Sequence, residues 1–324
     1  MENVSKFTLV GAVLTAFALP VPAIEGAFGR TVPGFWITPR AGVVGPKPGF
    51  NFTIAPVGYR GSMSALEGSR KADAPVGIAA AGVLVPRIDV DGNSNYLVTQ
   101  YVYRTDSVKV SLASSFMIRP TWAGVTASFQ SGDRGRRFTD AGLADLIFSP
   151  LTVGIHFSPT NNLAIGALVF APTASFTPGN LSSLGQGAWT VMPHVAHTYG
   201  WPKQGLELDN FVGFDIYSRT PSTNYRSGTM FHWDSMLLKY VARNRFAAGA
   251  IVGNLTQITD DTGILANQLH GFQGRAWGAG PTAVYLAKLQ NPAVILQIRA
   301  VPEFAVTNLT QGVTLLLGLT FKWN

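Results

Sequence analysis

Hydrophobic and polar residues alternate with a period of two along much of the chain. In Leu206–Arg219 the even-numbered positions are mainly apolar, whereas the odd-numbered positions carry most of the charges. Successive side chains of a β-strand point to opposite faces, so this segment is predicted to be a strand with one apolar and one charged face. The same pattern recurs in Gly312–Trp323, where the odd-numbered positions are apolar.

The chain contains twelve segments predicted to be strands, and the connections between them are alternately longer and shorter. Bacterial outer-membrane barrels have an even number of strands, short periplasmic turns and longer outer loops. We therefore predict an all-β fold, a transmembrane antiparallel β-barrel of about 12 strands. A soluble β-sandwich, which also alternates, requires the loop lengths to alternate by chance. The predicted strands are 49–60, 94–103, 108–129, 143–157, 163–171, 188–200, 206–219, 228–241, 245–258, 274–287, 293–304 and 312–323.

The first 23 residues have the pattern of a signal peptide. A single cation, Lys6, precedes an apolar run at Phe7–Leu19, and small residues end the segment at Ala23. A membrane-spanning helix needs ~20 apolar residues, so export is favoured over a membrane anchor. We therefore expect three parts: a signal peptide at 1–23, an N-terminal periplasmic or lumen segment at 24–48, and the barrel at 49–324.

Composition narrows the function classes. The absence of cysteine excludes a disulfide scaffold, a thiolate metal site and a cysteine nucleophile. The formal net charge of +7 would suit an anionic lipid surface or nucleic acid, but export removes the chain from nucleic acid. Charged residues make up only 13% of the chain and it has 20 Phe, so disorder is not expected.

Signatures of catalysis are weak. His194 and His197 are three residues apart, which places them on opposite faces of a strand and prevents them from binding one metal ion side by side. Nucleophile-elbow, phosphate-loop and dinucleotide motifs are absent from the sequence. Asp89–Asn95 has oxygen-bearing side chains at alternate positions, but its glycine is misplaced for a calcium loop, and a polar turn is expected. We expect neither enzymatic activity nor a metal or cofactor.

The charged faces of the predicted strands carry the most functional information. Charges inside a barrel must be paired or hydrated, so they line a wet pore or form ion pairs across the lumen. Barrels filled by side chains are a purely structural alternative. We expect Arg299 to pair with Asp215 or Asp234. The residues predicted to face the lumen and set selectivity are Lys109, Arg119, Glu207, Asp209, Asp215, Arg219, His232, Asp234, Gln297, Arg299 and Glu303.

Two further segments carry hypotheses. Arg134, Arg136 and Arg137 form a basic cluster in the predicted outer loop Gln130–Gly142, where guanidinium groups could bind lipopolysaccharide phosphates or simply be solvated. The segment Ile24–Pro48 is rich in Pro and Gly and is expected to be irregular. It is either a loose periplasmic tail or a plug that enters the lumen.

Several short motifs resemble one known family. Gly142, Asp145 and Pro150 in GLADLIFSP match a family pattern of Gly, Asp and Pro. NYRSGTMFHWD at Asn224–Asp234 and GRAWGAGP at Gly274–Pro281 are also similar. The chain thereby resembles the outer-membrane family named for the meta-pathway of phenol degradation. The resemblance implies an outer-membrane transporter of hydrophobic or aromatic compounds.

Together these observations predict a channel in the bacterial outer membrane for passive passage of small hydrophobic or aromatic compounds. Its expected partners are outer-membrane lipid and lipopolysaccharide, small hydrophobic solutes and the barrel-assembly machinery, with no nucleic acid. A structural or adhesive barrel that conducts nothing is the alternative.

Overall fold

The structure is a computed structural model that describes residues 30–64, 76–78, 83–85, 87–128, 135–178, 180–241, 245–263, 273–287 and 292–323. The predicted signal peptide and Arg134 lie outside these ranges. Within these ranges, the structure contains no helix that is long and apolar enough to cross a membrane. The strands are β1 (Gly49–Ser64), β2 (Val76–Ile78), β3 (Val83–Val85), β4 (Arg87–Val102), β5 (Val110–Ile118), β6 (Pro120–Ser128), β7 (Arg136–Leu143), β8 (Leu146–Ser158), β9 (Asn161–Ala171), β10 (Thr190–Trp201), β11 (Leu206–Tyr217), β12 (Met230–Val241), β13 (Phe246–Gln257), β14 (Arg275–Ala287), β15 (Ala293–Thr307) and β16 (Gln311–Trp323).

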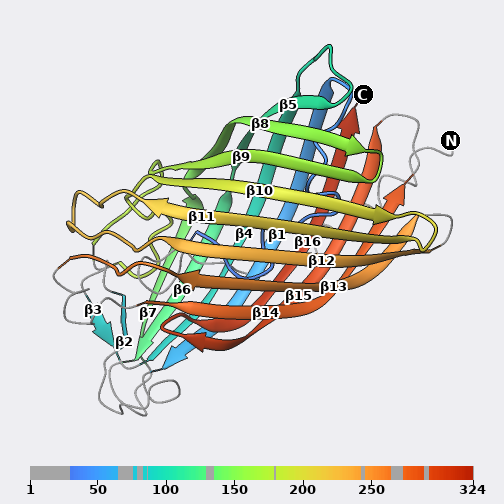
Figure 1. Cartoon of the computed structure of the whole chain (residues 1–324). Coiled ribbons are helices and arrows are strands. Elements are labelled where there is room, and N and C mark those ends of the chain that lie inside the picture. The colour runs from blue at the N-terminus through green and yellow to red at the C-terminus, as the bar shows by residue number, and fades with distance from the viewer. Residues whose placement is uncertain are drawn as a thin grey trace, which may run out of the picture.

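All of these strands except β2 and β3, which pair only with each other, form one antiparallel sheet. This sheet closes into a barrel, because β1 pairs with β16 on one side and with β4 on the other (Figure 1). β5 and β6 are two halves of one crossing, since both pair with β4, and β7 and β8 are likewise halves of the next. Counted in this way, the described strands form a wall of twelve antiparallel strands. The predicted fold and strand number are therefore confirmed. Pro120, which has no N–H to donate, follows the break between β5 and β6.

Two predicted boundaries were wrong at one end of the barrel. Asp89–Asn95 is not a turn but part of β4, where Asp91 forms an ion pair of 2.9 Å with Arg137. Most of the predicted loop Gln130–Gly142 forms β7, which pairs with β6. Polar strand residues that pair across neighbouring strands look like turn residues in the sequence, because both kinds of segment are rich in Asp and Gly.

The exterior of the barrel is apolar and bears two aromatic belts. Trp189 and Trp277 lie near the strand ends that carry the long connections, whereas Trp201, Tyr285 and Trp323 lie near the opposite ends. These rings are 36–50% exposed, as rings at lipid–water interfaces are. The barrel is thus a membrane-spanning one. We call the end with short turns, where β1 begins and β16 finishes, the periplasmic end, and the opposite end the outer end.

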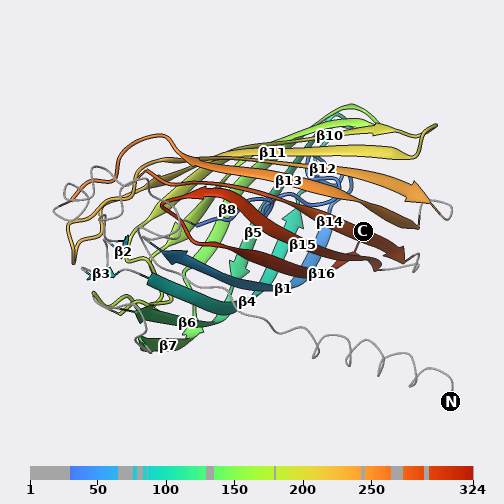
Figure 2. The same cartoon turned by 90° about the horizontal axis from the view of Figure 1, so that it is seen from below.

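The lumen is filled by the chain itself. Residues 30–48, which precede β1, lie inside the barrel (Figures 1 and 2), where Phe35, Ile37 and Val44 join the buried core with inward-facing side chains of the wall. The described part of the connection between β9 and β10 also packs inward, because Leu181 and Leu184 are buried and Leu184 contacts Ala123 and Ala144.

The outer loops after β11 and β13 are joined by a buried carboxylate. Asp261 accepts hydrogen bonds from the Gly228 amide at 2.7 Å, from the Gln257 side-chain amide at 2.8 Å and from the Tyr225 hydroxyl. Burial raises the pKa of the Asp261 carboxyl to about 6. Asp261 thus titrates in the range in which an ordinary aspartate is already fully ionised.

This pKa makes the docking of the two loops depend on pH. Because the pKa in the folded state lies above the unfolded value, the folded state gains stability as pH falls through about 6. We expect the Gly228 amide to exchange more slowly at pH 5 than at pH 7.5, after correction for the intrinsic exchange rate. Asp261→Asn should abolish the difference and Asp260→Asn should preserve it. Equal protection at both pH values in the wild type would contradict this account.

The apolar exterior yields a depth-dependent prediction. Ile298, 48% exposed near the middle of β15, faces outward, whereas Val294 lies near the periplasmic end of the same strand. Ile298→Arg should lower the free energy of unfolding in lipid vesicles by about 2–4 kcal/mol, and Val294→Arg by about 1 kcal/mol or less. Urea titration of the folded fraction measures both. Equal costs would mean that the two positions do not differ in membrane depth.

Candidate functional site

Two wall charges bind the backbone of the N-terminal segment from opposite sides. The Asp234 carboxylate accepts hydrogen bonds from the amides of Gly34 at 2.7 Å and Trp36 at 3.0 Å. The Arg299 guanidinium donates to the carbonyls of Phe35 at 2.6 Å and Ile37 at 2.5 Å. An irregular buried segment has no strand partner for its amides and carbonyls, so these side chains supply the missing partners.

The expected ion pair between Arg299 and Asp215 or Asp234 was therefore wrong. The irregular segment exposes both amides and carbonyls, so its amides bind the carboxylate and its carbonyls bind the guanidinium. Asp234 and Arg299 satisfy the segment between them instead of each other. The two residues are 1% and 3% exposed, so neither charge is balanced by bulk water.

The segment is bound in the same way towards the periplasmic end. Asp209 accepts from the Ala41 amide at 3.1 Å and from the Thr198 hydroxyl at 2.5 Å, and Thr198 in turn accepts from the Gly42 amide at 2.9 Å. A Cβ atom at Gly42 would lie only 2.5 Å from the Asn162 carbonyl oxygen. This close approach of segment to wall therefore requires glycine.

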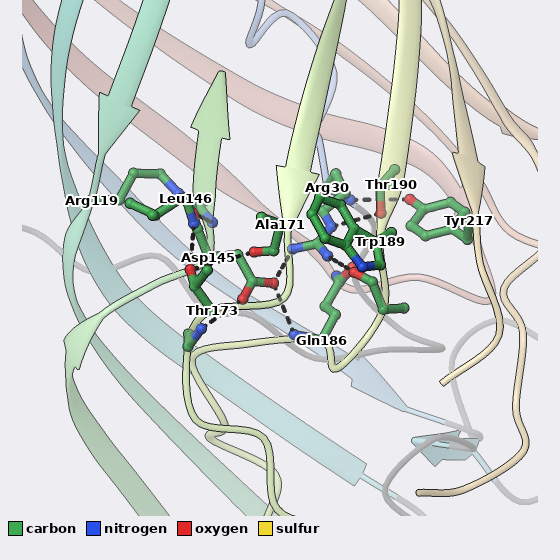
Figure 3. A network of polar contacts seen from close by, with 12 residues as sticks. Arg30, Arg119, Asp145, Leu146, Ala171, Thr173, Gln186, Trp189, Thr190 and Tyr217 are labelled. Carbon is green, nitrogen blue, oxygen red and sulfur yellow. Dashed lines mark hydrogen bonds and ion pairs between the residues drawn. The ribbon is translucent and has the colours of Figure 1, made fainter. Parts of the chain in front are cut away.

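At the outer end the segment is anchored by a buried ion pair (Figure 3). The Arg30 guanidinium lies 2.6 Å from the Asp145 carboxylate and also donates to the Thr190 hydroxyl at 3.0 Å and the Ala188 carbonyl at 2.8 Å. The side chains of Arg30 and Asp145 are 3% and 0% exposed. A guanidinium whose three nitrogens each bind a different partner fixes the position of the segment.

Asp145 also fixes the inward-packed loop and the break in the wall. Its carboxylate accepts from the amides of Ala174 at 3.0 Å and Gln186 at 3.2 Å. Its carbonyl accepts from the Arg119 guanidinium at 3.4 Å, and Arg119 lies over the Tyr96 ring. One residue therefore links the N-terminal segment, the loop that closes the outer end and the junction between β7 and β8.

Most residues predicted to face the lumen are buried inside the barrel, but two were placed wrongly. Lys109 lies in the exposed turn that precedes β5, and Arg219 lies beyond the end of β11, where it donates to the Asn224 carbonyl. The alternation continues past the strand ends, and this is why the sequence placed both residues inside. The buried ones are Arg119, Glu207, Asp209, Asp215, His232, Asp234, Gln297, Arg299 and Glu303.

Three of these residues act within the wall. The Asp215 carboxylate lies 3.7 Å from the His232 imidazole, whose Nε2 also lies 3.0 Å from the Met192 sulfur. The Glu303 carboxylate accepts from the Tyr59 hydroxyl at 2.9 Å and the Gly312 amide at 2.8 Å. These interactions join strands that are one or two places apart in the wall, and their partners do not belong to the N-terminal segment.

Arg136 and Arg137, which were predicted to lie in a loop, are successive residues of β7. Their side chains therefore point to opposite faces of the strand. Arg137 pairs with Asp91 and its guanidinium lies 5.8 Å from the centre of the Trp122 ring. Arg136 lies over the Phe138 ring. Arg137 therefore already has a carboxylate partner.

Two cavities remain beside the segment. One, of about 340 Å³, lies in the lumen and is lined by apolar and aromatic side chains that include Phe35, Trp36 and Tyr96. The other, of about 600 Å³, lies at the periplasmic end and is lined by Arg40, Glu207 and others. Both include Arg40 and Val43, so they adjoin each other along the segment.

Aromatic rings surround the N-terminal part of the segment. The Trp36 ring stacks on that of Phe211 with centroids 6.5 Å apart, and the Phe35 ring lies 5.2 Å from that of Tyr96. Arg30, Trp36 and Asp145 were not among the predicted site residues. Only Asp145 had a sequence signal, since it lies in the GLADLIFSP motif.

Solved structures share the fold. An outer membrane channel from Pseudomonas putida F1 superposes with a TM-score of 0.68 at 15% sequence identity, covering 89% of this chain and 100% of that one. The toluene transporter TbuX of Ralstonia pickettii gives a TM-score of 0.42 at 11% identity, covering 94% of this chain and 98% of that one. The first likeness establishes the barrel fold, and the second carries no further argument.

The sequence itself settles the family. No curated protein matches it significantly. The family model described as "Putative MetA-pathway of phenol degradation" matches residues 73–319, more than two thirds of the chain. The chain belongs to this family.

Proposed function

We propose that the protein is an outer-membrane channel through which small hydrophobic or aromatic compounds pass down their concentration gradient. The observation that carries the proposal is the aromatic-lined lumen cavity, which adjoins the cavity at the periplasmic end. A preformed apolar cavity with a few polar groups is typical of sites for small organic molecules. The family description, which names phenol degradation, and the fold shared with an outer membrane channel support the same function.

Residues 30–48 form the gate of this channel. Polar and charged side chains of the wall bind the backbone of the segment from Gly34 to Gly42, and the Arg30–Asp145 pair anchors it beside the loop that closes the outer end. Passage requires the segment or this loop to move. Residues 1–23 act as the signal peptide, so the mature chain begins just before the anchor at Arg30.

The outer end of the wall carries charges of both signs. Arg60, Arg137, Asp89 and Asp91 line a polar cavity of about 420 Å³ there. We infer that Arg134, Arg136 and Arg137 contact lipopolysaccharide at this end, and that the assembly machinery inserts the barrel. The protein acts as a channel and not as an enzyme.

One observation favours the second candidate, a structural or adhesive barrel. Among the described residues, the N-terminal segment packs into the core inside the barrel, and the loop between β9 and β10 packs against the wall at the outer end. A barrel whose segment never moves would conduct nothing, and its outer loops would be its working surface.

Uptake into vesicles separates these functions. Liposomes that contain the purified protein should take up small aromatic solutes faster than protein-free liposomes, and planar bilayers should show discrete current steps. A correctly folded protein that gives neither uptake nor current would exclude the channel and leave the structural barrel. The folded state is checked by its heat-dependent migration on gels.

The buried ion pair predicts how the gate opens. Asp145→Asn leaves the Arg30 guanidinium without its charge partner, so we expect the free energy of unfolding to fall by about 3 kcal/mol. The open fraction in single-channel recordings should rise at the same time. The control Asp91→Asn removes an exposed ion pair on the outer side of the wall and should change neither quantity much. An unchanged open fraction in Asp145→Asn would show that the anchor does not hold the gate.

A further inference from the structure

The lumen cavity has an unbalanced set of charges. Three cationic side chains line it, Arg40, Arg299 and Lys322, and its lining includes neither Asp nor Glu. Arg299 uses two of its nitrogens to bind the N-terminal segment. Arg40 lies 3.7 Å from Glu207, which belongs to the adjoining periplasmic cavity.

Within the described ranges, no carboxylate pairs with Lys322. It lies on the lumen face of β16, next to Asn51 of β1 and Ala293 of β15 in the strand register. In the part of the chain that the structure describes, its ammonium group has neither a hydrogen bond nor an ion pair. The nearby charge is that of Arg40, which repels it. A cation held in such a place is stabilised by an anion that enters the cavity.

Other donors in the same lining are also unsatisfied. The Trp36 indole nitrogen, the Gln297 amide nitrogen and the Arg299 Nε atom are buried and have no acceptor among the described residues. Gln297 and Arg299 are 6% and 3% exposed. Buried donors without acceptors are costly, and their concentration around one cavity indicates a ligand rich in acceptors.

One part of the cavity wall is apolar and is formed by Trp36, Tyr96, Met117, Leu168 and Ile295. The remainder includes polar side chains such as Asn51, Gln100 and His194. The cavity volume of about 340 Å³ is enough for one single-ring aromatic molecule. The cavity therefore combines a surface for a ring with a site for a negative charge.

We propose that this cavity is a binding site for small aromatic carboxylates on their way through the channel. The carboxylate group pairs with Lys322 and Arg40 at the periplasmic part of the cavity, and the ring packs on the apolar wall. This inference rests on the proposed function and narrows it from aromatic compounds in general to those that carry a negative charge.

Three molecules of nearly the same shape test the charge preference. Benzoate is anionic, benzamide is neutral and benzamidinium is cationic. Titration calorimetry of the full chain in detergent should show benzoate binding about tenfold more tightly than benzamide, because it gains a charge-assisted hydrogen bond. Benzamidinium should bind least tightly.

Variants of Lys322 test whether the preference for benzoate over benzamide arises in this cavity. Lys322→Met should lower the affinity for benzoate about tenfold and change that for benzamide less than about twofold. Lys322→Glu should reverse the order, so that benzamidinium binds better than benzoate. The control Lys239→Met removes an exposed cation at the same end of the barrel that does not line the cavity, and it should leave all three affinities unchanged. If the Lys322 variants do not fold, Arg40→Gln should produce the same selective loss of benzoate binding.

The outcomes separate this inference from the proposed function. Equal affinities for benzoate and benzamide in a protein that conducts and takes up aromatic solutes would overturn the carboxylate site and leave the channel standing. Selective benzoate binding in a protein that never conducts would support the carboxylate site. It would overturn the proposal that solutes pass through the barrel. A loss of benzoate binding in Lys239→Met equal to that in Lys322→Met would also overturn the site, because general surface charge would explain it.

Discussion

The structure depends on the way in which buried charges of the wall bind the backbone of the N-terminal segment. Asp234 binds two amides and Arg299 two carbonyls of the same four-residue stretch, from Gly34 to Ile37. Without the segment, the Asp234 carboxylate and the Arg299 guanidinium would each lose these hydrogen bonds inside the barrel. Removing the partner of a buried charge is strongly destabilising. The segment therefore stabilises the wall as much as the wall positions the segment, and the two are expected to fold as one unit.

This arrangement also explains how a narrow barrel can be both filled and usable. A lumen packed only with interlocking side chains would have to unpack many residues to open. Here a continuous segment occupies the lumen, and its polar bonds to the wall are mainly hydrogen bonds to its backbone, together with the ion pairs and hydrogen bonds of the Arg30 and Arg40 side chains. Water or a polar solute can replace such bonds one at a time. The cavities that remain beside the segment mark where solutes already have room.

The sequence predicted the wall well because strand alternation is a local property. The even and odd positions of Leu206–Arg219 have different chemistry whatever lies around them, and the structure confirms a strand with its charged face inward. The errors lie where local signals are ambiguous. Asp89–Asn95 is polar strand at the outer end, and Lys109 and Arg219 continue the alternation beyond the strand ends.

The site could be predicted only in part, because its partners are distant in the chain or have no side-chain signature. The lumen carboxylates were recognisable, but nothing local shows that Asp234 binds amides of a segment 198 and 200 residues away. Arg30 and Asp145 are 115 residues apart, and only the complete barrel brings them together. The sequence did not predict Trp36 as a site residue, because its position beside the cavity depends on where the whole segment lies in the barrel.

The most direct test of this account uses the absence of native cysteine, which makes a single introduced thiol unambiguous. Thr38 lines the lumen cavity and is exposed to it. In planar bilayers, a charged thiol reagent added on the side that faces the barrel's termini should alter the current through Thr38→Cys channels and leave wild-type channels unchanged. If the introduced thiol reacts completely and the current stays the same, the segment does not occupy the conduction path, and the account is contradicted.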